Sequence, residues 1–91
     1  MNKVEIYETA IKKWGKEAQI LMVLEEMSEL SMLLFHSLRK NREPDNWQIA
    51  EETADVEIML EQLKYMFPIR EEVIEFKERK LKRLEAKLKD D

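Results

Sequence analysis

Residues 17–40 read EAQILMVLEEMSELSMLLFHSLRK and carry the longest helical pattern in this 91-residue chain. Apolar residues recur there every three or four positions, which is the period of one face of an α-helix. This apolar row consists of Ile20, Val23, Leu24, Met27, Leu30, Leu34 and Leu38. Other apolar residues fall outside the row, namely Leu21, Met22, Met32, Leu33 and Phe35. One small bundle would not bury them all, so we expect homo-oligomer formation, with this surplus surface packed against another copy.

Three further helices are predicted around this one. The first covers residues 3–13 and ends at Gly15, the only glycine of the chain. The polar residues 41–46, which include Pro44, break the helical pattern, and the third helix should begin near Asp45 and reach about residue 66. Pro68 suits the first turn of a fourth helix. We therefore predict an all-α chain that forms one domain over residues 1–91, a four-helix bundle completed by homo-oligomerisation.

Composition excludes several classes of protein. No run of about 18 apolar residues occurs, so no membrane span is expected. The first residues lack the apolar core of a signal peptide, which favours a cytoplasmic protein. The absence of cysteine excludes disulfides and thiolate catalysis. The net charge of −4 argues against a nucleic-acid polymer as the main ligand. Residues 77–89 are nevertheless basic, and they form either a solvated face or a wall facing an anionic ligand.

Two acidic motifs stand on the second and third predicted helices. They are Glu25-Glu26-x-x-Glu29 and, after 22 intervening residues, Glu52-x-x-Asp55. Carboxylates three positions apart project from neighbouring places on one side of a helix. Glu26 and Glu52 each have apolar residues at helical spacing on both sides. Because a carboxylate on a core-facing row is costly to desolvate, each of them needs a partner that offsets its charge.

Antiparallel packing of these two helices would bring Glu26, Glu29, Glu52 and Asp55 around one point. Four negative charges that close together require protons or cations. Carboxylate oxygens without cysteine favour a hard cation, Mg²⁺ first and Mn²⁺ second, and such an ion typically binds substrate phosphates and activates water for attack on phosphorus. A dinuclear iron site is disfavoured because the single histidine, His36, is not at Glu-x-x-His spacing. The alternative is two solvated helix faces with surface ion pairs.

The paired motifs resemble the signature of the MazG-like all-α nucleotide pyrophosphohydrolases over residues 15–88. The resemblance implies Mg²⁺-dependent cleavage of a nucleoside triphosphate, or deoxynucleoside triphosphate, to the monophosphate and pyrophosphate, often to remove unwanted nucleotides. It makes Glu26, Glu29, Glu52 and Asp55 the metal ligands and Glu25 a water-orienting carboxylate. Lys80 and Arg83 correspond loosely to a phosphate-contacting stretch on the last helix. The family also suggests a dimer or a dimer of dimers, with a nucleotide as partner and no membrane.

Two alternatives stay open at this point. Phosphoribosyl-ATP pyrophosphohydrolase has a similar size and similar acidic motifs, but its Leu-Tyr-His-like continuation is missing after Asp55. A helical interaction module without enzymatic activity would also explain the high charge and the amphipathic last helix. Gln19 lies two turns before Glu26 and is a candidate for contact with a base, since its amide both donates and accepts. Trp14 and Trp47 are predicted to be packing or oligomer anchors.

Overall fold

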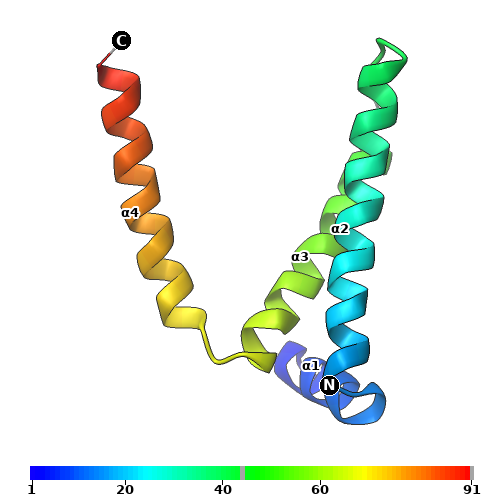
Figure 1. Ribbon diagram of the computed structural model, residues 1–91. Helices are drawn as coiled ribbons and strands as arrows, with labels where there is room; N and C mark the ends of the chain where they lie inside the picture. Colours follow the sequence, from blue (N-terminus) through cyan, green and yellow to red (C-terminus); the bar gives the residue numbers. More distant parts are fainter. Residues whose placement is uncertain (44, 91) are drawn as a thin grey trace.

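The described part of the chain folds into four helices connected by short links (Figure 1). A computed structural model describes residues 1–43 and 45–90. The helices are α1 (Lys3–Trp14), α2 (Lys16–Arg39), α3 (Asn46–Met66) and α4 (Arg70–Lys89). This confirms the all-α prediction, and none of the described residues forms a strand. No described helix combines the length and the apolar character needed to cross a membrane.

The helix ends follow the local signals in the sequence, with one exception. The side chain of Asn2 caps α1 by accepting a hydrogen bond from the Glu5 N–H, and the Asp45 side chain does the same for the Trp47 N–H at 2.8 Å. Gly15 separates α1 from α2 with φ of 91°, a conformation that favours glycine. The placement of Pro68 in the first turn of α4 was wrong. Helix α4 begins at Arg70, with Ile69 at the N-cap position.

The C-terminus of α2 is closed by a Schellman motif. The Arg42 N–H donates to the Ser37 carbonyl at 3.0 Å, and the Asn41 N–H donates to the Leu38 carbonyl at 3.1 Å. Asn41 takes the left-handed conformation, with φ of 53°, that this motif requires. Two carbonyls of the last turn thereby gain partners, which explains why the helix stops here. Pro44, which we expected in this break, lies outside the described residues.

Helices α1, α2 and α3 form the packed part of the molecule. Helices α2 and α3 run antiparallel, and α1 lies across one end of this pair (Figure 1). The core there is small, with Val23, Met59 and Met66 buried. Partly buried Ile11, Ile20 and Leu63 pack against it. So few buried residues indicate that hydrophobic burial within one chain is limited.

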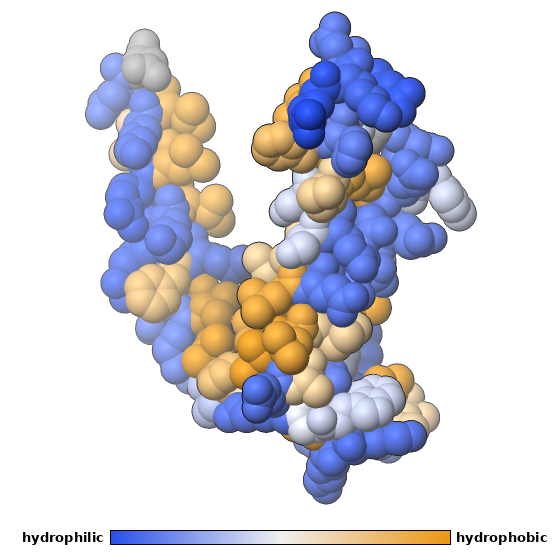
Figure 2. Space-filling view, turned by 45° about the vertical axis from the view of Figure 1, so that its right-hand side comes forward, coloured by the Kyte–Doolittle hydropathy of each residue, from blue (hydrophilic) through white to orange (hydrophobic). Residues whose placement is uncertain are grey.

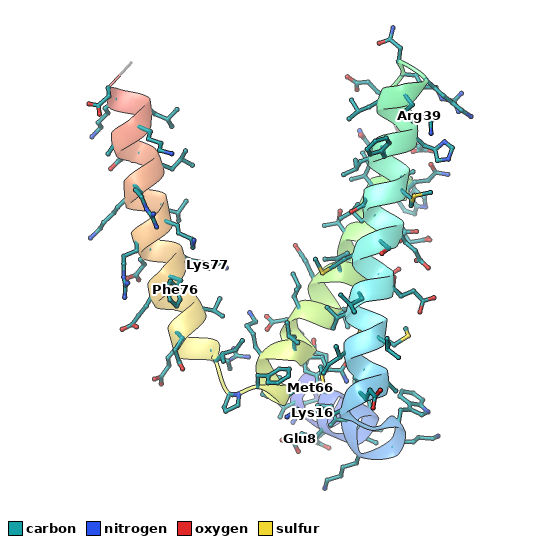
Figure 3. All side chains as sticks on the ribbon, in the orientation of Figure 1. Glu8, Lys16, Arg39, Met66, Phe76 and Lys77 are labelled. Carbon is teal, nitrogen blue, oxygen red and sulfur yellow. The ribbon has the colours of Figure 1, made fainter. Side chains whose placement is uncertain are left out.

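Helix α4 leaves this packed part and runs away from α2, which gives the molecule the outline of a V (Figure 1). Its hydrophobic side chains gather on the side that faces the α2–α3 pair, and charged ones cover the other side (Figure 2). Ile74, Leu81, Leu84 and Leu88 are each at least half exposed. Lys77 extends from α4 into the V (Figure 3). Helix α4 therefore has an apolar face that its own chain does not cover.

Ion pairs hold the corner between α3 and α4. Glu61 Oε2 lies 3.1 Å from Lys64 Nζ and 3.6 Å from Arg70 Nη1, and Arg70 is the first residue of α4. The Arg70 guanidinium also stands over the ring of Tyr65, 5.1 Å from its centroid. These contacts orient only the start of α4, so its remaining length projects freely from this chain.

Candidate metal centre

Three carboxylates from α2 and α3 meet at the middle of the antiparallel pair. Glu26 projects from α2, and Glu52 and Asp55 project from α3, one turn apart. One carboxylate oxygen from each residue can be chosen so that all three lie within 4.8 Å of one another. The antiparallel packing expected from the sequence therefore does bring the two motifs together, and we call this group the acidic cluster.

Two oxygens of the acidic cluster are buried without a partner. Glu26 Oε2 and Glu52 Oε2 are inaccessible to solvent, and no hydrogen bond to either is found within residues 1–43 and 45–90. Desolvation, followed by the negative charges of Glu29 and Asp55, raises the pKa of Glu26. The same causes, in the same order, raise the pKa of Glu52. Both carboxylates are therefore harder to ionise than an isolated glutamate, and a nearby positive charge would favour their ionised form.

Glu29 borders the acidic cluster. It is exposed on α2 and is not one of the three residues that converge, yet its charge acts on both Glu26 and Glu52. A cation drawn into the cluster would thus find a fourth carboxylate beside it. Glu25 is also exposed, and it lies about 100° around the helix from Glu26. Its predicted water-orienting role stays a prediction.

The acidic cluster suits a hard divalent cation. Octahedral Mg²⁺ holds its ligands at about 2.1 Å, so opposite ligands are separated by about 4.2 Å. Three oxygens within 4.8 Å need only small side-chain rotations to reach that geometry. Oxygen-only ligation also matches the preference of Mg²⁺ and Mn²⁺. The two unpartnered oxygens would then gain the partner they lack.

The two cations expected to contact phosphates lie elsewhere. Lys80 and Arg83 are exposed on α4, which does not pack against α2 in this chain. A single copy therefore does not bring them to the acidic cluster (Figure 1). Their role as phosphate contacts stays a prediction, and within one chain it would require α4 to move.

A largely apolar groove of about 590 Å³ lies beside the acidic cluster, between α1 and the α2–α3 pair. Its walls include Tyr7, Trp14, Gln19, Met22, Met59 and Gln62. Met22 precedes Glu26 by four residues, and Met59 follows Asp55 by four. Because α2 and α3 run antiparallel, Met22 and Met59 are displaced from the acidic cluster in the same direction along the helix pair. The groove therefore begins about one helical turn from the cluster.

The groove contains two buried amides, of which the sequence indicated only one. Gln19 was a predicted base contact, and it is 5% exposed. Gln62 was missed, although it is 3% exposed and its Nε2 donates to the Tyr7 carbonyl at 3.4 Å. Its signal was a polar residue on a core-facing row, between Met59 and Met66. The predicted packing of Trp14 and Trp47 is not seen within this chain, where both are largely exposed.

The comparisons with known proteins add no assignment to this geometry. No protein-family model, curated protein or solved structure matches the chain.

Proposed function

We propose that this protein is a Mg²⁺-dependent nucleoside triphosphate pyrophosphohydrolase of the MazG-like kind. The observation that carries the proposal is the acidic cluster, in which Glu26, Glu52 and Asp55 converge within 4.8 Å. Two of its oxygens are buried and unpartnered, which is unfavourable unless a cation binds there. The paired motifs at family-like spacing supply the same ligands independently of the geometry.

The residues of the acidic cluster would divide the work as follows. Glu26, Glu52 and Asp55 hold the ion, and Glu29 completes the ligand set from its exposed position on α2. Mg²⁺ held there would supply positive charge for the phosphate oxygens and would lower the pKa of a water molecule. Glu25 would orient the attacking water and take its proton. Water then cleaves the bond between the α and β phosphates, and the monophosphate and pyrophosphate leave.

Surface area supports homo-oligomerisation as part of this proposal. The chain exposes 7894 Å², whereas a compact monomer of 11.0 kDa exposes about 5,600 Å². The surplus exceeds the roughly 800 Å² that each partner buries in a standard interface. Leu81, Leu84 and Leu88 repeat on α4 with the spacing of a helix–helix seam. We therefore propose that a second copy packs against the apolar face of α4, as a dimer or within a dimer of dimers.

A separation of faces on α2 makes this assembly compatible with catalysis. Leu24, Met27 and Leu38 are exposed and lie on one side of α2. Met22 and Glu26 lie about 100° or more away from these three residues around the helix axis, given 100° per residue. A partner helix that packs on Leu24, Met27 and Leu38 would therefore leave the Glu26 side of α2 uncovered.

The hydrolase assignment is tested by incubating the protein with the four deoxynucleoside triphosphates and Mg²⁺. We expect release of pyrophosphate and a monophosphate, without orthophosphate, and no turnover in excess EDTA. Orthophosphate as the first product, or no turnover with either Mg²⁺ or Mn²⁺, would refute the proposal.

The oligomer is tested by Leu84→Glu, with Ala86→Glu as a matched control that adds the same charge on α4 outside the row of Leu81, Leu84 and Leu88. Sedimentation should show a smaller species for Leu84→Glu alone. A monomeric parent protein would overturn this part of the proposal.

A second candidate is an interaction module without catalysis, which the uncovered face of α4 favours. Thermal melts distinguish the two. The hydrolase should gain stability when Mg²⁺ is added, by about 2.7 kcal/mol at 100 times its Kd, because the ion binds only the folded cluster. A Tm that is unchanged by Mg²⁺ and Mn²⁺ would favour the interaction module.

A further inference from the structure

The groove beside the acidic cluster has the features of a small-molecule pocket. Its volume of about 590 Å³ falls in the usual range for such sites, and its walls are mainly apolar with few polar groups. Trp14 contributes an exposed aromatic ring, and Tyr7 a buried one. A flat, aromatic ligand with a polar edge suits this combination of walls.

The two buried amides are not equivalent. The orientation of the Gln62 amide is fixed, because its Nε2 donates to the Tyr7 carbonyl. The reversed amide would place Oε1 against that carbonyl, and neither oxygen has a proton to donate. That contact leaves Gln62 Oε1 available as an acceptor. Gln19 is 5% exposed and also lines the groove. The groove thus offers one fixed acceptor and one amide that can donate and accept.

The position of the groove identifies which part of a nucleotide it would hold. Gln19 precedes Glu26 by seven residues, which is roughly 10 Å along α2. If the phosphates are held at the acidic cluster, the sugar spans this distance and the base reaches the groove. This step rests on the proposed function, because it takes the cluster as the phosphate end.

We infer that the groove binds the base of the nucleotide and prefers bases with an amino group at C4 of a pyrimidine or C6 of a purine, namely cytosine and adenine. One N–H of such a group donates to Gln62 Oε1, and the other donates to Gln19 Oε1. The neighbouring ring nitrogen accepts from Gln19 Nε2, as in amide recognition of adenine. Guanine, uracil and thymine place a carbonyl oxygen where this amino group would be. It would face the fixed Gln62 Oε1, so two acceptors would oppose each other without a proton.

Binding can be measured without turnover. In a Trp47→Phe background, Trp14 is the sole tryptophan, and its fluorescence reports occupancy of the groove. The deoxynucleoside monophosphates are titrated in Mg²⁺. We expect dCMP or dAMP to bind at least about tenfold more tightly than dTMP and dUMP, the discrimination typical of one well-placed amide contact. The Gln19→Leu substitution should remove this preference, whereas Gln48→Leu, at an exposed glutamine of α3, should keep it.

Each outcome decides the inference. Equal affinity for all bases, no binding, or a preference that survives Gln19→Leu overturns it. So does a smaller oligomer for Gln19→Leu, which would show that another copy fills the groove. Pyrophosphate release is measured separately across the triphosphates. Turnover without base preference would support the hydrolase proposal and refute the base assignment. Base-selective binding without turnover would support the base assignment and refute the hydrolase proposal.

Discussion

Glu52 and Glu61 are the same amino acid on the same helix, nine residues apart, and their surroundings are opposite. Glu52 lies beside the carboxylates of Glu26 and Asp55, and desolvation followed by the charge of Glu29 raises its pKa. Glu61 meets Lys64 and Arg70, and its interaction with Lys64 lowers its pKa. Two cations within this chain thus compensate the charge of Glu61, which links α3 to the start of α4. The Glu52 end lacks a positive charge, and this difference marks it as the place for a ligand.

The largest expected effect concerns Glu52. Glu52→Gln removes one ligand charge, so we expect pyrophosphate release to fall by at least about 100-fold. The Tm without metal should stay the same or increase, because an uncompensated charge is lost. Glu57→Gln, an exposed position on α3, serves as control and should leave activity unchanged. A Glu52→Gln protein with full activity would remove the distinction between the two ends of α3.

Glu29 should show an intermediate effect. It borders the acidic cluster from an exposed position, so Glu29→Gln should weaken Mg²⁺ binding by about tenfold, as loss of an outlying ligand contact does. Titration of the Tm with Mg²⁺ measures this shift. An unchanged Mg²⁺ affinity in Glu29→Gln would remove Glu29 from the proposed ligand set.

The pH dependence of stability should differ in sign between the two ends of α3. The raised pKa values of Glu26 and Glu52 favour the protonated form in the fold, so their contribution is complete below pH 4.5 and is lost as pH rises through the folded pKa values. The lowered pKa of Glu61 contributes above pH 4.5 and is lost as pH falls through its folded value. Melts in EDTA measure both terms. Glu52→Gln should reduce the loss of stability with rising pH and leave the part due to Glu26, and Glu61→Gln should reduce the loss with falling pH.

The smallest effect is expected for Glu61→Gln at neutral pH. The Glu61 side chain is 43% exposed, so solvent screens its ion pairs, and we expect a destabilisation of at most about 1 kcal/mol. In a domain of this size, that lowers the Tm by roughly 4–8 °C or less. Pyrophosphate release should not change. A loss of activity would connect the α3–α4 corner to the site.

The helices were predictable from the sequence because local signals set their ends. The meeting of the acidic motifs was predictable because apolar positions showed which sides of the two helices pack together. Asn2, Gly15 and Asp45 end or begin helices through contacts within a few residues. Glu26 and Glu52 lie on apolar rows, so packing of α2 on α3 had to bring them near each other. The orientation of α4 was not predictable, because it depends on the ion pair between Glu61 and Arg70. Under the proposed assembly it also depends on contacts with another copy. Gln62 was missed because its partner, Tyr7, is 55 residues away.

The open V also bears on how the protein responds to its own abundance. Its radius of gyration is 16.5 Å, against about 12 Å for a compact chain of this length. Most apolar side chains of α4 have no partner within the same chain. If copies associate through this face, folding gains free energy by mass action, and the Tm rises with protein concentration. Dilution would then lower the free energy of unfolding, so a newly made copy would reach its full stability only after it associates with a second one.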